Sequence, residues 1–291
     1  YSLSMENPVR ATTLDVVKKS KFVKINHEKI LEIAKEWVKK GIKVSAWDRR
    51  MHFETRDQKL MINYLILLDS LNFCFWALDR KEKWNINYKG KKYSGYFALS
   101  LSLKKFFENN PDKSNFEYFS QIKFDEFAKI LKGRGELQFL KKRWEIVRAV
   151  SAVFLKKYGG DAEKFVLLAG HKFSDLIPKI VKELPSFNDE AKFGAKKVYL
   201  WKRPQILAVD IFAGLGGWGS GHFLDLDFPT AFPDYKLPQI MRHWGILEYS
   251  TDLARKIDNK ILIKASGREE VEIRSATVWV AEYLRDAPIS L

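Results

Sequence analysis

The sequence predicts a mainly α-helical protein that forms a single domain over residues 1–291 and contains a small β-hairpin. Three observations lead to this prediction. Apolar residues recur every three or four positions along most of the chain, whereas strict alternation is confined to one segment. No repeat, low-complexity linker or change in composition divides the sequence. The 291 residues are 46% hydrophobic and 14% aromatic, which is enough for a sizeable core.

In the first half of the chain, helical spacing predicts helices over residues 26–40, 57–78 and 97–109. Gly41 ends the first of them. Between the second and the third, Trp84, Ile86 and Tyr88 alternate with polar residues, and a Lys-Gly pair follows. This pattern predicts the β-hairpin, within residues 83–96.

In the second half, the same spacing predicts helices over residues 123–132, 136–158, 164–171, 181–187, 238–247, 251–257 and 269–286. A short extended piece is expected at residues 198–201. Pro204 then opens a helix that runs through Phe212, because proline is tolerated in a first helical turn. The glycine-rich stretch 214–221 is expected to be a flexible connector or lid.

The formal net charge of +15 favours anionic partners. The basic residues are scattered as pairs on expected helix faces, with no arginine-rich tail and no RNA-binding signature. A nucleotide-sized anion is therefore expected more than a long polymer. A lysine-rich solvated surface is the plainer explanation of the charge.

Cys74 is the only cysteine, which excludes a disulfide within the chain and suits a reducing compartment such as the cytoplasm. Residues 1–10 show no signal-peptide pattern, and the apolar stretch 60–78 is too polar for a membrane span. The five histidines have no paired metal-ligand spacing, so neither a metal nor a cofactor is predicted.

One candidate site lies within residues 69–76. If the helix over residues 57–78 is continuous, one of its faces carries a carboxylate, an amide and two rings: Asp69, Asn72, Phe73 and Trp76. Rings stack on a flat base, while an acid and an amide hydrogen-bond to its edge. The alternative is structural, because a buried carboxylate can also serve as a hydrogen-bond partner for another helix end.

A second candidate site combines Lys202 and Arg203 with Asp210. The two cations stand just ahead of the helix that Pro204 opens, where free backbone N–H groups favour an anion. A phosphate at that end and a carboxylate further along would suit a nucleotide 5′-monophosphate. A surface Lys-Arg pair beside an ordinary amphipathic helix explains the same spacing.

The stretch over residues 209–217 also resembles the first motif of cytosine-C5 DNA methyltransferases, which bind S-adenosylmethionine. Its context is wrong for that class. It lies late in the chain, Pro204 suits a helix start better than a central strand, and Cys74 is upstream and not preceded by proline. Two further segments, residues 232–239 and 270–274, read as ordinary helix starts when taken alone.

Taken together, five segments resemble the queuosine salvage protein family, also described as queuosine 5′-phosphate N-glycosylase/hydrolase. They are DSLNFCFW at 69–76, YSGY at 93–96, KRPQILAVD at 202–210, FPDYKLPQ at 232–239 and EVEIR at 270–274. They occur in the family's order. The glycine-rich segment after Asp210 departs from the family's pattern.

The resemblance implies a helical fold similar to the helix-hairpin-helix DNA glycosylases. It implies hydrolysis of the N-glycosidic bond of queuosine 5′-monophosphate, which releases queuine and ribose 5-phosphate for salvage into tRNA modification. It implies Asp210 as the catalytic carboxylate, and it implies substrate binding by Asp69, Asn72, Phe73, Trp76, Tyr96, Lys202, Arg203, Asp234 and Tyr235.

The expected partner is a small nucleotide, with no stable nucleic-acid complex, no membrane and a monomeric chain. Two alternatives stay open. One is a nucleic-acid base glycosylase of similar fold, which the +15 charge favours. The other is a binding module that holds a modified base or RNA without catalysis.

Overall fold

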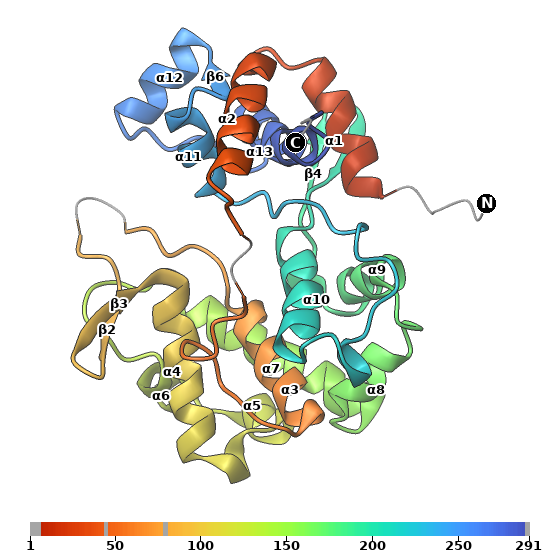
Figure 1. The fold of residues 1–291 in the computed structure, drawn as a ribbon. Coiled ribbons are helices and arrows are strands. Elements are labelled where there is room, and N and C mark those ends of the chain that lie inside the picture. The colour runs from red at the N-terminus through yellow and green to blue at the C-terminus, as the bar shows by residue number, and fades with distance from the viewer. Residues whose placement is uncertain (1–6, 44–45, 78–80, 289–291) are drawn as a thin grey trace. The chain divides into compact units, whose positions relative to one another are not determined.

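The computed structural model describes residues 7–43, 46–77 and 81–288. Contacts among them group into two compact units (Figure 1). Unit 1 comprises the described residues within 1–44, 188–205 and 226–291, and unit 2 comprises those within 45–187 and 206–225. Each unit is mainly helical with small antiparallel strand pairs, which confirms the mainly α-helical class. The single domain over residues 1–291 stays a prediction.

The elements of unit 1 come from three separate parts of the chain. They are α1 (Pro8–Lys18), β1 (Val23–Ile25), α2 (His27–Lys39), β4 (Glu190–Phe193), β5 (Lys196–Tyr199), α11 (Leu237–His243), β6 (Leu247–Tyr249), α12 (Thr251–Asp258) and α13 (Arg268–Arg285). Helix α10 (Lys202–Gly214) starts in this unit and continues into unit 2.

Helix α13 is the centre of unit 1. It packs against α1, α2, α11, β1 and β4, and in Figure 1 the red α1 lies beside the blue α13. One apolar cluster joins α13 to β1, α2 and α11, with Ile273, Ala276 and Val280 on α13. A second cluster joins α13 to α1 and β4 through Val271, Val16 and Ala191. Because this helix contacts most of the others, residues near the two ends of the chain share one core.

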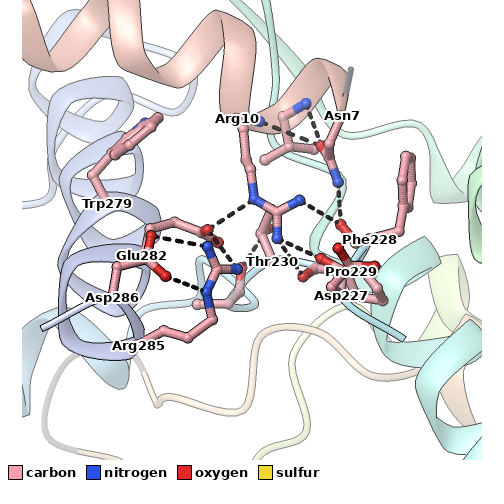
Figure 2. Close-up of polar contacts among 12 residues, drawn as sticks. Asn7, Arg10, Asp227, Phe228, Pro229, Thr230, Trp279, Glu282, Arg285 and Asp286 are labelled. Carbon is pink, nitrogen blue, oxygen red and sulfur yellow. Dashed lines mark hydrogen bonds and ion pairs between the residues drawn. The ribbon is translucent and has the colours of Figure 1, made fainter. Parts of the chain in front are cut away.

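Arg10 ties α1 to two later segments of the chain (Figure 2). Its Nε lies 2.8 Å from a carboxylate oxygen of Glu282 on α13. Its remaining nitrogens donate to the backbone carbonyls of Asp227, Phe228 and Pro229 at 2.7–3.1 Å. A guanidinium group is suited to this task because its donors point in several fixed directions.

Two strand pairs of unit 1 were not predicted from the sequence. Strand β1 pairs with β6, so Lys24 lies opposite Glu248, and β4 pairs with β5 as a hairpin. The extended piece expected at residues 198–201 overlaps β5 at Val198 and Tyr199, whereas residues 200 and 201 lie outside the strand. The helix expected over residues 238–247 was too long, because Leu247 begins β6 instead.

Unit 2 contains the remaining elements and part of α10. They are α3 (Gln58–Ser70), β2 (Asn85–Tyr88), β3 (Lys91–Ser94), α4 (Gly95–Asn109), α5 (Phe116–Gln121), α6 (Phe124–Ile130), α7 (Leu140–Tyr158), α8 (Ala162–Leu167) and α9 (Phe173–Glu183). Three short 3₁₀ helices lie at Pro111–Lys113, Pro185–Phe187 and Gly219–Gly221.

Helix α3 is the core helix of unit 2. Every residue from Met61 to Ser70 is buried, and the helix contacts α4, α7 and α8. A helix that is apolar on all sides is expected to be surrounded by others. Its polar exceptions, among them Asn63 and Asp69, are buried as well.

The predicted β-hairpin is confirmed as β2 and β3, with Tyr88 opposite Lys91. Lys89 and Gly90 between them both have positive φ, which matches the turn type preferred by two-residue hairpins. Helix α4 follows directly after β3, so the hairpin and the start of α4 are held together.

Helix α9 begins at Phe173, eight residues before the expected start at 181. Pro178 lies inside this helix although proline lacks an N–H. The carboxylate of Asp225 accepts hydrogen bonds from the N–H groups of Phe173 and Ser174 at 2.7 and 2.9 Å. A cap from a distant residue therefore fixes this helix start.

The glycine-rich stretch 214–221 is hydrogen-bonded to two helices. The N–H of Ser220 donates to the side chain of Gln58 at 3.0 Å, and the Ser220 hydroxyl donates to Glu163. Gly219 has a φ of +57°, and a Cβ there would meet the Gln58 amide at 2.4 Å. The positive φ favours glycine at this position, and a Cβ would in addition displace the flexible end of the Gln58 side chain.

None of the helices in the described part of the chain combines the length and the apolarity needed to cross a bilayer.

Candidate active site

The carboxyl group of Asp210 stands on α10, within unit 2. Leu207, Ala208 and Ile211 form the fully buried face of the helix, and Asp210 lies at the margin of that face, partly exposed. The predicted helix is thereby confirmed. The methyltransferase-like interpretation is not, because residues 209–214 are helical, so the glycines follow helix α10 directly and not a strand.

The pKa of the Asp210 carboxyl group lies well above the usual value for aspartate. Burial raises its pKa to about 7, although a hydrogen bond with Tyr96 acts in the opposite direction. The Tyr96 hydroxyl oxygen lies 3.3 Å from Oδ2 of Asp210. A carboxyl group that titrates near neutral pH can both accept and donate a proton, which is what general acid–base chemistry requires.

Tyr96 stands in the first turn of α4, directly after the hairpin. Its hydroxyl also lies 2.9 Å from Nε2 of His52, which is buried with 4% of its surface exposed. Nδ1 of His52 is 2.8 Å from the backbone carbonyl of Asp48. The ring of Trp47 stacks on that of His52, with centroids 3.9 Å apart. Tyr96 was predicted as a site residue, whereas His52 was missed.

Asp69 and Asn72 lie together, as predicted. The Asn72 side-chain amide donates to Oδ1 of Asp69 at 3.3 Å, and both residues are buried. Asp69 also acts on the tyrosines nearby. Burial first, and then the charges of Asp210 and Asp69, hold the pKa of Tyr96 well above its usual range.

The prediction of a continuous helix over residues 57–78 was wrong. Helix α3 ends at Ser70, and residues 71–77 are irregular, so Asn72, Phe73 and Trp76 do not share a helix face with Asp69. The remainder of the predicted helix, residue 78, lies outside the described residues. Cys74 has a φ of +46°, which a helix cannot accommodate.

The end of α3 is explained by Arg143 of α7, which is fully buried. Its guanidinium donates to the backbone carbonyls of Leu71, Phe73 and Cys74. It also stacks over the Phe73 ring, 4.1 Å from the ring centroid. These contacts use carbonyls that a continuing helix would bond internally, so they favour the irregular conformation.

Lys202 and Arg203 lie in the first turn of α10 and not ahead of it, because the helix starts at Lys202 rather than at Pro204. The N–H of Lys202 donates to Oδ2 of Asp189 at 3.0 Å. Asp189 in turn is paired with Arg274 of α13. At this helix start, one N–H is therefore already bound to a carboxylate of the protein.

Asp234 and Tyr235 precede α11 in unit 1. Oδ1 of Asp234 accepts hydrogen bonds from the N–H groups of Lys236 and Leu237 at 2.8 and 2.9 Å. The helix-start interpretation of this segment is confirmed. Arg274 donates to the neighbouring carbonyl of Pro233 at 2.8 Å, which links this turn to α13.

Among the residues that the structure describes, no group of three or more His, Cys, Asp or Glu side chains is placed to hold a metal ion.

Comparison with known proteins identifies the family. The model of the family described as "Queuosine salvage protein" matches residues 51–290. A protein of Sphaerobacter thermophilus named queuosine 5′-phosphate N-glycosylase/hydrolase is 35% identical over 279 residues, which cover 96% of this chain and 85% of that protein.

Two eukaryotic proteins of the same name are similar over comparable lengths. The Mus musculus protein is 29% identical over 95% of this chain and 83% of its own length. The Dictyostelium discoideum protein is 31% identical over 96% of this chain and 86% of its own length. The chain belongs to the queuosine salvage protein family.

Proposed function

We infer that this chain hydrolyses the N-glycosidic bond of queuosine 5′-phosphate and so releases queuine and ribose 5-phosphate. The family match over residues 51–290 supports this function, as do relatives of that named activity in a bacterium, a mammal and an amoeba. The single observation that carries the chemistry is the partly exposed carboxyl of Asp210, with its pKa near 7 and its hydrogen bond to Tyr96.

Asp210 is the proposed catalytic residue. Cleavage of a glycosidic bond develops positive charge at C1′, and a carboxylate facing that charge stabilises it. Asp210 either stabilises the cation directly, attacks it transiently, or orients the water that adds to it. All three roles use the carboxylate form, which becomes the major form above about pH 7.

The leaving base sets a specific requirement. A 7-deazaguanine has carbon where a purine has the basic N7, so the usual site of protonation is missing. The protein has to stabilise the departing base through its other polar atoms. Asp69 and Asn72, which are already hydrogen-bonded to each other, are the proposed partners of the base edge, and Phe73 and Trp76 the proposed packing partners. Each good edge contact contributes about 1–3 kcal/mol.

Four residues of unit 1 are further candidates for substrate binding. Lys202 and Arg203 are the proposed cations for the 5′-phosphate, and their partial exposure leaves them accessible. Asp234 and Tyr235 are proposed to contact the base. Binding energy from the phosphate, remote from the reacting bond, would position C1′ for cleavage.

We further propose that the chain is a monomer in the cytoplasm, that its product enters queuine salvage for tRNA modification, and that its fold is similar to helix-hairpin-helix DNA glycosylases. The helical character of both units supports the last point. The single cysteine supports the proposed location in the cytoplasm, because it suits a reducing compartment.

The test is incubation of the purified chain with queuosine 5′-monophosphate, followed by chromatography for queuine and ribose 5-phosphate. The Asp210→Asn variant is measured beside it, because asparagine keeps the shape and removes the charge. Asp252→Asn is a matched control, since Asp252 is an exposed carboxylate on α12.

The parent and Asp252→Asn should release queuine at equal rates, and Asp210→Asn should be slower by roughly 10²–10⁴-fold. Absence of release by the parent would refute the function. Salt-dependent retention of tRNA with base release from the polymer would then favour the base-glycosylase alternative.

A further inference from the structure

His52, Tyr96 and Asp210 form a continuous hydrogen-bonded chain within unit 2. Nε2 of His52 lies 2.9 Å from the Tyr96 hydroxyl oxygen, which lies 3.3 Å from Oδ2 of Asp210. The three residues come from a loop, from α4 and from α10. The catalytic role proposed for Asp210 does not involve His52, and it uses the tyrosine hydroxyl only as a hydrogen-bond partner.

The hydrogen atoms along this chain can be counted. Nδ1 of His52 faces the backbone carbonyl of Asp48, which can only accept, so Nδ1 carries a hydrogen. A neutral His52 therefore offers Nε2 as an acceptor. The hydroxyl of Tyr96 has a single hydrogen, which it can donate to His52 or to Asp210 but not to both.

Both hydrogen bonds consequently form only when the chain carries one additional proton. Either Asp210 is protonated and donates to Tyr96, which donates to a neutral His52, or His52 is protonated and donates to Tyr96, which donates to an ionised Asp210. The two arrangements have the same net charge. They interconvert when one proton moves across each of the two hydrogen bonds.

We propose that His52 and Tyr96 are a proton relay that sets the ionisation of Asp210: Nε2 of His52 holds the proton while Asp210 acts as a carboxylate, and Tyr96 transfers it between them. This inference rests on the proposed function, in which Asp210 is catalytic. His52 and Tyr96 act through Asp210 and are positioning residues.

The surroundings determine which arrangement is populated. Burial lowers the pKa of His52, and the charge of Lys104 on α4 adds to this effect, while the Asp48 carbonyl and carboxylate oppose it. Lys104 is held beside the loop because its Nζ donates to the backbone carbonyl of His52 at 2.7 Å. These groups favour a neutral His52 in the resting enzyme.

The charged groups around Asp210 determine the protonation state of the tyrosines beside it. The charges of Asp69 and Asp210 both add to burial in raising the pKa values of Tyr64 and Tyr96. Tyr96 therefore keeps its hydrogen at neutral pH and transfers protons as a hydroxyl, never as a tyrosinate. A protonated Asp210 and a neutral His52 are the resting state, and the developing positive charge on the substrate favours the other arrangement.

The reaction remains balanced with the relay in place. The C1′–N bond breaks and its electron pair stays on the base nitrogen. Meanwhile the proton of Asp210 passes to Tyr96, and that of Tyr96 passes to His52. The oxygen of a water molecule bonds to C1′, and the proton that this water releases ends on the base. The relay then returns to its resting state, without net gain or loss of a proton.

Two substitutions test the relay because they change the titration of Asp210 in opposite directions. Tyr96→Phe removes the hydrogen bond to the carboxylate, so the acid limb of the kcat profile should move to higher pH by about one unit. In His52→Gln, the glutamine side-chain amide replaces Nε2 as a hydrogen-bond donor to Tyr96, but the amide cannot bind an additional proton. Tyr96 is then free to donate to the carboxylate, and the limb should move to lower pH by a similar amount.

A purely structural role would lower kcat in both variants without opposite shifts of the profile. Shifts in the same direction, or none, would overturn the proposal. The pH dependence of kcat is measured with saturating queuosine 5′-monophosphate, and circular dichroism verifies that each variant folds.

A second measurement does not depend on catalysis. The side-chain carboxyl ¹³C signal of Asp210 is identified by its absence in Asp210→Asn and followed by NMR against pH. Its midpoint, near pH 7 in the parent, should rise in Tyr96→Phe and fall in His52→Gln by about one pH unit each, because the first variant removes a donor to the carboxylate and the second leaves Tyr96 free to donate to it. An unchanged midpoint overturns the relay even if queuosine 5′-monophosphate is cleaved. A shifted midpoint in a chain that cleaves no queuosine 5′-monophosphate supports the proton coupling and refutes only the proposed function.

Discussion

Asp189 and Arg274 form an ion pair in unit 1, with Nη2 of Arg274 2.6 Å from Oδ2 of Asp189. The same oxygen of Asp189 accepts the N–H of Lys202 at the start of α10. Burial would raise the pKa of Asp189, but Arg274, the Lys202 N–H and the charge of Arg203 hold it below its usual value. One carboxylate thus links α13 to the first turn of α10.

Replacing Asp189 by Asn should lower the free energy of unfolding at pH 7 by about 1.5–3 kcal/mol, because Arg274 loses its nearer carboxylate and keeps only Glu270, 3.5 Å away. The pKa of Asp189 is depressed by folding, so its contribution is complete above the unfolded pKa, near 4, and is lost as the pH falls through the folded value. Urea unfolding at pH 7 and pH 3 should show a smaller difference between parent and variant at pH 3. Asp258→Asn, which breaks an exposed pair with Arg242, should cost less than 1 kcal/mol.

Arg143→Lys should destabilise the chain by about 3 kcal/mol or more and should also lower activity. A lysine cannot donate simultaneously to the carbonyls of Leu71, Phe73 and Cys74, so buried acceptors lose their partners. Arg148→Lys is the matched control on the same helix, since Arg148 makes one exposed bond to Ser120. Thermal unfolding that is equal in the two variants would contradict this role of Arg143.

Asp210→Asn should be more stable than the parent, and more so at pH 8 than at pH 5. Folding raises the pKa of Asp210 from about 4 to about 7, so the native state binds more protons in this range and the parent loses stability as the pH rises. With a discount for its partial exposure, the additional gain at pH 8 is about 1–2 kcal/mol. Chemical denaturation at both pH values measures it, and an equal difference at the two would refute the raised pKa.

Lys202→Ala and Arg203→Ala should each reduce kcat/KM for queuosine 5′-monophosphate by about 10–100-fold, which corresponds to about 1.4–2.8 kcal/mol of lost interaction. Neither should change the much lower rate on the free nucleoside, which has no phosphate to bind. Lys192→Ala, an exposed cation on β4, serves as the control. Equal losses on both substrates would exclude the phosphate-binding role.

Local signals predicted the elements whose ends are decided by neighbouring residues. Gly41 follows α2, the Lys89-Gly90 turn joins β2 to β3, and Gly159 ends α7, each with positive φ. In these cases the residue at the boundary itself adopts the conformation that stops the element, so the sequence is sufficient.

Where prediction failed, distant residues decide the structure. Helix α3 stops at Ser70 because Arg143, more than 70 positions later, holds the carbonyls that follow. Strand β1 exists through its pairing with β6, from the other end of the chain. No window of neighbouring residues contains such information.

Some residues of the candidate site could be predicted from the sequence, and others could not. Asp210, Tyr96 and Asp69 were chosen through the family's motifs. The proximity of Asp69 and Asn72 was predicted from helical spacing, although the helix ends between them. His52 belongs to none of the motifs and has no helical or strand periodicity around it. Only the folded loop brings its ring to the Tyr96 hydroxyl, 44 positions away.

Because unit 1 is built from three separate parts of the chain, it cannot be completed on the ribosome until its last part has been translated. Helix α1 emerges early, whereas its partner α13 is translated more than 200 residues later. At about 5–20 residues per second, roughly ten to fifty seconds separate the two. Until β5 and then α13 are translated, the apolar face of α1 lacks its native partners in the nascent chain, and it is then a natural target for chaperones. Unit 2, by contrast, has most of its residues in one uninterrupted stretch, 45–187, and can begin to condense first.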